Sequence, residues 1–155
     1  MKNLMKIVHL ISLCVFFGSI VTYVFLGLIT PETDMHALAL SREWVLKSTT
    51  YLTVVAMCTT GFTGLVLSGK PKSFWVWAKL FSFMLICLNT YFFVYPAIVT
   101  STLALGTDEL KFLEALEYEA IFGAFNIVLI LMSIVFAVSK PKLSVAGIKR
   151  AMKAN

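Results

Sequence analysis

Asp and Glu are missing from residues 1–31, 44–107 and 120–155 of this chain. All eight acidic residues lie instead at 32–43 and 108–119. Basic residues show the opposite distribution, because nine of the thirteen Lys and Arg residues lie at 2–6, 70–72 and 140–153. Long apolar runs separate the acidic segments from the basic ones. A bilayer that holds the two kinds of segment on opposite sides explains this alternation.

Charge of either sign is scarce. Charged residues make up 14% of the 155 residues, against roughly 25% in an ordinary soluble domain. Hydrophobic residues make up 59% and the mean hydropathy is +0.90, which is more apolar surface than a soluble globule of this length can bury. The composition therefore predicts an integral membrane protein with a single domain.

Several chemical signatures are also absent. The chain has no phosphate-binding loop, no catalytic-triad pattern and no His and carboxylate cluster with zinc spacing, which argues against a soluble type of enzyme. Cys14, Cys58 and Cys87 lie in three different apolar runs and form no Cys-x-x-Cys pair, so we expect free thiols. The net charge of +5 comes from residues that flank apolar runs, which predicts contact with lipid headgroups and no nucleic-acid partner.

Four apolar runs are present, at about 7–29, 45–67, 74–98 and 118–138. The first covers roughly 34 Å as a helix, enough to cross a hydrocarbon core. Lipid offers backbone groups no hydrogen-bond partners, so each run should be helical. The excess of Lys and Arg on one side, against Arg42, Lys47 and Lys111 on the other, predicts cytoplasmic termini. The expected fold is all-α, an antiparallel four-helix bundle over residues 1–142.

Two segments outside the runs carry their own predictions. Leu110, Leu113 and Leu116 repeat at helical spacing within the acidic segment 108–119, which predicts an amphipathic start that extends the fourth helix outward. The basic cytoplasmic tail 143–155 is either a short interfacial helix or disordered.

Polar side chains recur at three- and four-residue spacing on one stripe of each run. Small and hydroxylated residues there favour close helix packing, and Asn89 and Asn126 are expected to hydrogen-bond across the bundle. The stripes contain His9, Ser12, Phe16, Ser19 and Tyr23; Thr49, Thr53, Ala56, Thr60 and Thr63; Lys79, Ser82, Ile86, Asn89 and Phe93; and Glu119, Phe122, Asn126, Ile130, Ser133 and Ala137.

His9 and Lys79 are the two nitrogen-bearing side chains at similar depth in the basic half. One interpretation is interfacial: Lys79 lies only ~8 Å from the edge of its run and can extend its ammonium group to the headgroups. The other is functional, because imidazole is a good haem or metal ligand and a neutral lysine amine can also ligate. His36 is expected in the outer loop, roughly 40 Å from His9 along a helix, too far to share one metal.

The order of short motifs carries a family resemblance. The motifs are KIVH at 6–9, VFFG at 15–18, Arg42 before the second run, TGL at 63–65, WVWAK at 75–79, FN at 125–126 and VSKP at 138–141. This arrangement resembles the four-helix membrane proteins related to HemJ-type protoporphyrinogen oxidase and the copper-resistance CopD domain. The resemblance implies a bacterial inner-membrane protein that binds b-type haem through His9 and Lys79. Arg42 and Asn126 are further candidate cofactor-binding residues.

The chain also departs from that pattern. It has VFLGL at 24–28 where the HemJ-type enzymes continue into a Leu-Pro-Arg run and a second His, and it has no His near Asn89. A sister family of the same superfamily is therefore expected, rather than the enzyme itself.

Three functions remain open at this point. The first is a haem-binding redox protein, a possible oxidoreductase, that exchanges electrons with quinone or a porphyrin. The second is a non-catalytic subunit or scaffold of a larger membrane assembly, or a homo-oligomer, suggested by aromatic outer faces and a threonine-rich second run. The third is copper transport or tolerance, for which Met57, Met84 and Met132 lie deep in separate runs as soft ligands.

Overall fold

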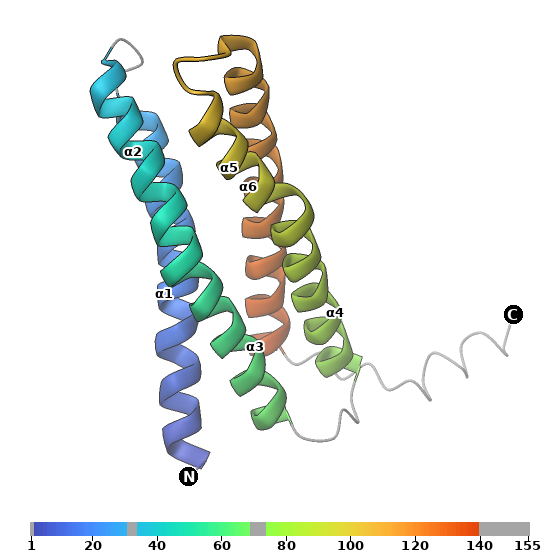
Figure 1. Cartoon of the computed structure of the whole chain (residues 1–155). Helices are drawn as coiled ribbons and strands as arrows, with labels where there is room; N and C mark the ends of the chain where they lie inside the picture. Colours follow the sequence, from blue (N-terminus) through green and yellow to red (C-terminus); the bar gives the residue numbers. More distant parts are fainter. Residues whose placement is uncertain (1, 31–33, 69–73, 140–155) are drawn as a thin grey trace, which may run out of the picture.

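The structure, a computed structural model, describes residues 2–30, 34–68 and 74–139 (Figure 1). Helix α1 spans Lys2–Ile29. The second long helix runs through α2 (Met35–Ser48), the π-helix η1 (Thr49–Thr53) and α3 (Val54–Ser68). The third runs through α4 (Phe74–Asn89), the π-helix η2 (Thr90–Val94) and α5 (Tyr95–Ala104), and α6 spans Glu109–Ser139.

The described residues contain helices and no strands, which confirms the all-α prediction. Within the described ranges, four helical segments of 26, 34, 30 and 31 residues are long and apolar enough to cross a membrane. Helix α6 begins at Glu109 and includes residues 109–119 of the acidic segment, so the prediction that this segment is helical and extends the fourth helix is confirmed. The tail 143–155 lies outside the described residues.

The second long helix begins well before the apolar run that predicted it. The Asp34 carboxylate accepts hydrogen bonds from the backbone N–H groups of His36 and Ala37, each at 3.0 Å. Such an N-cap satisfies donors that have no partner inside the helix, so α2 starts at Met35 instead of near residue 45. The prediction that His36 lies in a loop is wrong: it lies in the first turn of α2.

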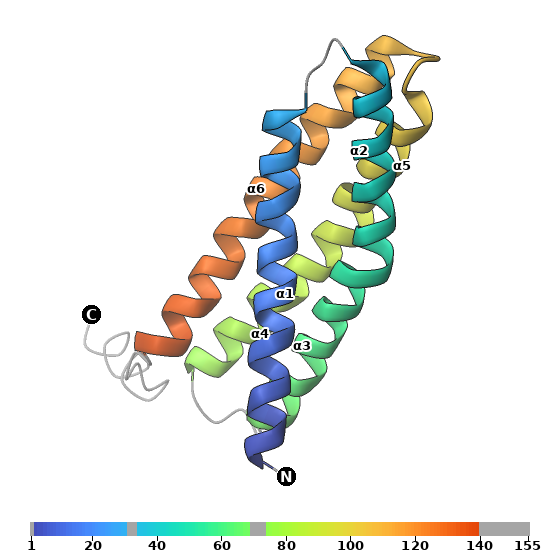
Figure 2. The ribbon, with the colours of Figure 1, turned by 90° about the vertical axis from the view of Figure 1, so that its left-hand side faces the viewer.

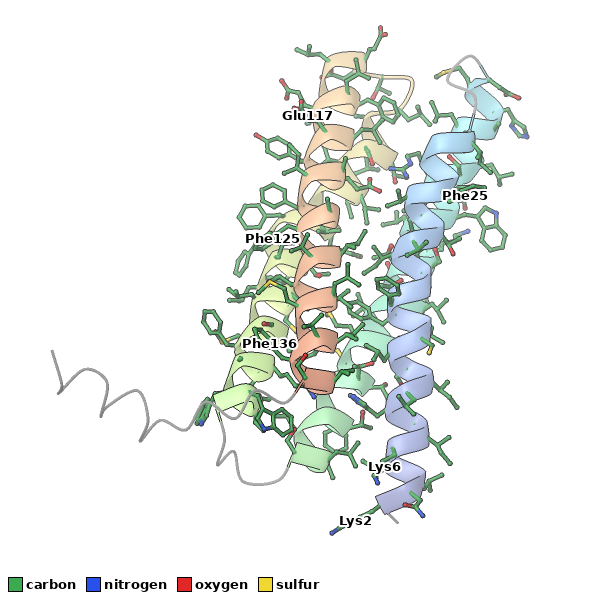
Figure 3. The ribbon with its side chains drawn as sticks, turned by 180° about the vertical axis from the view of Figure 1, so that it is seen from behind. Lys2, Lys6, Phe25, Glu117, Phe125 and Phe136 are labelled. Atoms are coloured by element: carbon green, nitrogen blue, oxygen red, sulfur yellow. The ribbon has the colours of Figure 1, made fainter. Side chains whose placement is uncertain are left out.

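The helices pack in two groups. Helix α1 packs mainly along α3, α6 packs along α4 and α5, and α2 contacts α5 (Figures 1 and 2). One end of the molecule, here called the basic end, carries the start of α1 with Lys2 and Lys6 (Figure 3). The acidic end is the opposite one, where α6 begins and Glu117 lies.

Both π-helices lie part-way along their long helices. Pro96 lacks the backbone N–H that would bond the Phe92 carbonyl, and its ring would clash there in an α-helix. In the preceding η2, the Tyr95 N–H instead bonds the Thr90 carbonyl, five residues back. The extra residue in this turn rotates the inward face, so Thr90 is buried whereas Phe93 is 49% exposed. Phe93 therefore leaves the polar stripe on which spacing had placed it and lies on the aromatic outer face.

The interior is rich in hydroxyl and amide groups, and the outer surface is apolar. A cluster of buried apolar side chains fills the space between the helices. Its members are Phe16, Ala56, Met57, Ile86, Leu129 and Ile130. The polar stripes of α1 and of α3 with η1 are turned inward as predicted. The buried polar and charged residues are Ser12, Ser19, Ser41, Arg42, Thr49, Thr53, Thr60, Thr63, Ser82, Asn89, Thr90, Ser101 and Asn126.

Candidate functional site

A small cavity lies between the helices near the basic end, and we call it the basic cavity. Its volume is about 130 Å³. His9 of α1 and Lys79 of α4 both line it, together with Gly61 and Gly64 of α3 and Ser133 of α6. The structure therefore brings the two candidate ligands predicted from the sequence to one place.

The His9 imidazole is held by α3 through one ring nitrogen. Nδ1 lies 3.1 Å from the Thr60 carbonyl oxygen and 2.9 Å from Thr63 Oγ1. The carbonyl can only accept, and the Thr63 hydroxyl already donates to the Thr59 carbonyl at 2.6 Å. Nδ1 therefore carries the proton and donates it. In the neutral ring Nε2 is then the basic nitrogen, and no protein group hydrogen-bonds to it among the described residues.

Glycines on α3 permit this close approach. A Cβ built at Gly64 would lie 3.2 Å from His9 Cε1, so a larger residue would push the imidazole away from α3. At Gly61 a built Cβ would clash with Phe83 Cε1 and Cζ. The Phe83 ring of α4 therefore rests on the backbone of α3 and helps to close the basic cavity.

The remaining polar groups of the basic cavity have few partners. The Lys79 ammonium lies 5.6 Å from the Trp75 ring centroid, within reach of a cation–π interaction. The hydroxyls of Thr60 and Ser133 are buried with no hydrogen-bond partner in the described part of the chain. Buried polar atoms without partners are rare and call for an explanation, such as a bound group.

A larger cavity of about 310 Å³ lies toward the other end, and we call it the acidic cavity. Its lining includes Arg42, Glu119 and Asn126, and residues of both π-helices. Phe16, which is only 2% exposed, lines both cavities and separates them.

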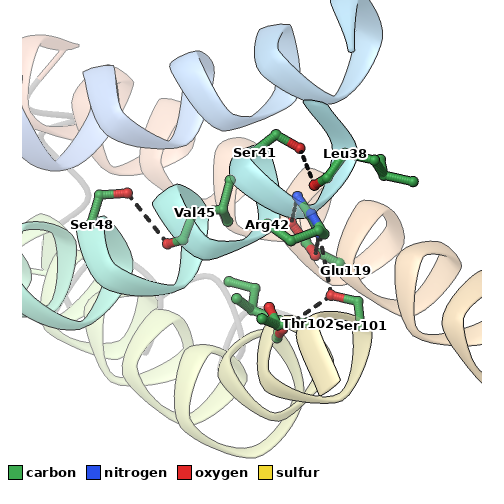
Figure 4. Close-up of polar contacts among 9 residues, drawn as sticks. Leu38, Ser41, Arg42, Val45, Ser48, Ser101, Thr102 and Glu119 are labelled. Carbon is green, nitrogen blue, oxygen red and sulfur yellow. Dashed lines mark hydrogen bonds and ion pairs between the residues drawn. The ribbon is translucent and has the colours of Figure 1, made fainter. Parts of the chain in front are cut away.

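An ion pair crosses the acidic cavity (Figure 4). Arg42 Nη1 donates to Glu119 Oε2 at 2.6 Å and to Ser101 Oγ at 3.3 Å. Nη2 donates to Glu119 Oε1 at 3.5 Å. The two side chains are only 5% and 17% exposed. Both residues stand out in the sequence, but their pairing was not predicted. The available signal was Glu119 itself, an acid on the polar stripe of the fourth run that needs a cation.

An amide network joins α4, η2 and α6 beside the ion pair. Asn89 Nδ2 donates to the Phe122 carbonyl at 2.8 Å and to Asn126 Oδ1 at 2.9 Å. Asn126 Nδ2 donates to Thr90 Oγ1 at 2.9 Å. These bonds confirm the prediction that the two asparagines bond across helices.

Replacing Asn126 with Leu should destabilise the protein by about 1–2 kcal/mol. The change removes two hydrogen bonds, and such bonds between membrane helices contribute about 0.6 kcal/mol on average and at most about 1.7. Thermal unfolding of the purified protein in detergent measures the effect. Asn3→Leu makes the same substitution at an exposed position and should leave the midpoint unchanged. Equal midpoints for both variants would show that the network contributes nothing to stability.

The four cofactor-binding candidates do not form one site. His9 and Lys79 line the basic cavity, whereas Arg42 and Asn126 line the acidic cavity. The described residues contain no group of three or more His, Cys, Asp or Glu side chains placed to hold a metal ion. The methionines behind the copper hypothesis do not converge either, because Met57 is buried in the core whereas Met84 and Met132 are 49% and 45% exposed.

Comparisons with protein-family models, with curated proteins and with solved structures found no match to this chain. The resemblance to the HemJ-type and CopD proteins therefore stays a prediction. The function has to be argued from the residues that line the two cavities.

Proposed function

We propose that the chain is an integral membrane protein whose four long helices cross the bacterial inner membrane as an antiparallel bundle. At 1.5 Å per residue, the shortest candidate span of 26 residues reaches about 39 Å, beyond the ~30 Å of a hydrocarbon core. The basic end faces the cytoplasm in this proposal, in keeping with the excess of Lys and Arg there. The apolar outer surface then meets lipid.

We further propose that the basic cavity binds b-type haem, which His9 would hold through Nε2. The observation that supports this most is the Nδ1 hydrogen bond to the Thr60 carbonyl oxygen. Metal-binding histidines typically donate their other ring N–H to a carbonyl or carboxylate, which fixes the tautomer and the ring orientation. In this proposal Lys79, which lines the same cavity, would either bind the iron as a neutral amine or pair as ammonium with a haem propionate.

The donor set fits haem, but the basic cavity as it stands does not hold the whole group. A volume of about 130 Å³ lies below the roughly 300 Å³ at which pockets for drug-sized ligands begin. Haem binding therefore requires α3 and α4 to separate at the basic end and the Phe83 ring to leave Gly61. Few residues of α3 and α4 contact each other, which makes this separation feasible.

Bound haem would supply one-electron redox chemistry. The protein would hold the iron through His9, exclude water with the apolar residues around Phe16 and Ile86, and place the group within the bilayer. The electron partner in this proposal is a lipid-soluble molecule, either a quinone or a porphyrin.

The visible spectrum tests this proposal. Protein purified gently from haem-replete cells should show a Soret band, and His9→Ala should lose it. His36→Ala is the matched control, because His36 lies exposed in the first turn of α2 and should leave the band intact. Absence of the band from the wild-type protein, or its persistence in His9→Ala, would reject His9 as a haem ligand.

A second candidate, a subunit of a larger membrane assembly, has its own supporting observation. Aromatic rings form a ladder on the outside of η2 and α6, with 4.3 Å between the Phe93 and Phe122 centroids and 6.0 Å between those of Tyr118 and Phe122. Tyr118 is 57% exposed. Such rings offer a rigid contact surface to a partner helix. Co-purification of a stoichiometric membrane partner supports this candidate, and a stable isolated monomer counts against it.

A further inference from the structure

The acidic cavity has the size and construction of a ligand site. Its volume of about 310 Å³ lies at the lower end of the range of roughly 300–1,000 Å³ typical of ligand pockets. Both π-helices form part of its wall, through Thr49 and Thr53 of η1 and Thr90 and Val94 of η2. π-Helical turns within α-helices occur frequently at functional sites.

The charges in the cavity favour a neutral ligand. Arg42 and Glu119 are the charged residues of its lining, and their contact at 2.6 Å neutralises both. An anionic ligand would have to displace Glu119 from Arg42. It would then leave a carboxylate buried without its partner, which is strongly unfavourable.

One hydroxyl group in the wall lacks a partner. The Thr49 side chain is 2% exposed, and its Oγ1 has no hydrogen-bond partner within the described ranges. The neighbouring polar groups are already paired: Thr53 Oγ1 donates to Ser19 Oγ at 2.9 Å, and Asn126 bonds Thr90. A buried hydroxyl that is left unpaired is unfavourable. Because this oxygen is itself buried, a ligand with an acceptor atom would satisfy it once the Thr49 side chain rotates toward the cavity.

The cavity has a loosely packed wall between α1 and α6. Gly27 of α1 and Gly123 of α6 line the cavity, and a Cβ built at either glycine meets no atom within 4 Å. Helix α1 packs mainly on α3, and α6 mainly on α4 and α5, so contact between α1 and α6 is sparse (Figure 3). This wall offers entry from the surrounding hydrocarbon.

We propose that the acidic cavity binds a neutral, lipid-soluble molecule with a carbonyl head group. The Thr49 hydroxyl donates a hydrogen bond to that carbonyl, and the apolar part of the molecule lies between α1 and α6. This site is separated from the basic cavity by Phe16. The proposal therefore does not depend on haem binding at His9.

Binding of a 1,4-benzoquinone with a decyl chain tests the site. The probe should raise the unfolding temperature of the purified wild-type protein in a concentration-dependent way, because a ligand that binds only the folded state stabilises it. Thr49→Val should weaken binding about two- to tenfold, the range expected for one lost hydrogen bond. Gly123→Leu should abolish binding by filling the cavity.

Two control variants match these changes. Thr60→Val removes another buried, unpartnered hydroxyl, but one that lines the basic cavity. Gly18→Leu adds a side chain where a Cβ meets open space, at a residue that does not line the acidic cavity. Both controls should bind the probe as the wild type does.

Three outcomes would overturn the proposal. The first is an unchanged unfolding temperature of the wild type at saturating probe. The second is equal stabilisation of Thr49→Val, Gly123→Leu and the controls, which would place the probe elsewhere. The third is stabilisation by decanoate but not by the quinone, which would make the ligand an anion. Haem binding is measured independently, by the visible spectrum. A protein without haem therefore does not affect the interpretation of the quinone-binding result.

Discussion

Replacing Arg42 with Gln should be among the most destabilising single changes in this protein, at about 3–5 kcal/mol, because it leaves the carboxylate of Glu119 buried without its partner. The side chains of this pair are 5% and 17% exposed, so little water reaches the orphaned charge. Glu119→Gln should have a similar effect by stranding the guanidinium. Thermal unfolding in detergent and the yield of monodisperse protein measure both losses.

The double variant Arg42→Gln with Glu119→Gln should recover most of the loss. Two neutral amides can hydrogen-bond to each other, and no buried charge remains. The ion pair between Glu43 and Lys47 gives a matched control, because its side chains are 55% and 66% exposed. Neutralising either of those residues should produce no measurable change, as is common for exposed pairs. Additive losses in the Arg42 and Glu119 double variant would show that the two side chains do not interact energetically.

The helical fold followed from the sequence because hydropathy and charge act over whole segments. The apolar runs predicted four helices, and the leucine spacing at 110–116 predicted the extension of the last one. The start of α2 was missed because the residues that follow Asp34 are too polar to be recognised as part of an apolar run. Their helix depends on the N-cap at Asp34 and on Glu119, which compensates the charge of Arg42.

The π-helices were beyond what the spacing of the polar residues could predict. A single extra residue in a turn changes the inward face of everything that follows, as the exposure of Phe93 and the burial of Ser101 show. Pro96 indicated an irregular backbone, because proline has no N–H group to bond the carbonyl of the residue four positions before it. It did not indicate whether the helix would kink, end or widen.

The candidate sites were only partly accessible from the sequence. Similar depth along two runs was enough to suggest that His9 and Lys79 lie near each other. The pairing of Arg42 with Glu119 joins residues 77 positions apart, and it depends on the packing of both α2 and α6 against α5. The hydrogen bonds that orient His9 come from Thr60 and Thr63, which spacing alone had assigned to helix packing.

Gly61→Ala is expected to destabilise the protein by about 1–3 kcal/mol, the usual cost of overpacking a filled site. The added Cβ would clash with two atoms of the Phe83 ring, closer than any van der Waals contact. Either the ring or the backbone of α4 must then move away from α3. Because alanine is intrinsically the better helix former, a loss of stability here can come only from this contact. Thermal unfolding in detergent measures the effect.

Two further variants isolate the cause. Gly18→Ala makes the same substitution in α1, where a Cβ meets nothing within 4 Å, so it should leave stability unchanged or slightly raise it. Combining Gly61→Ala with Phe83→Leu removes the ring that the new methyl group would strike, and should restore most of the stability lost in Gly61→Ala. If Gly61→Ala is as stable as Gly18→Ala, the ring does not rest on α3 as described. The basic cavity would then be wider beside Gly61, and haem could enter it without the separation of α3 and α4.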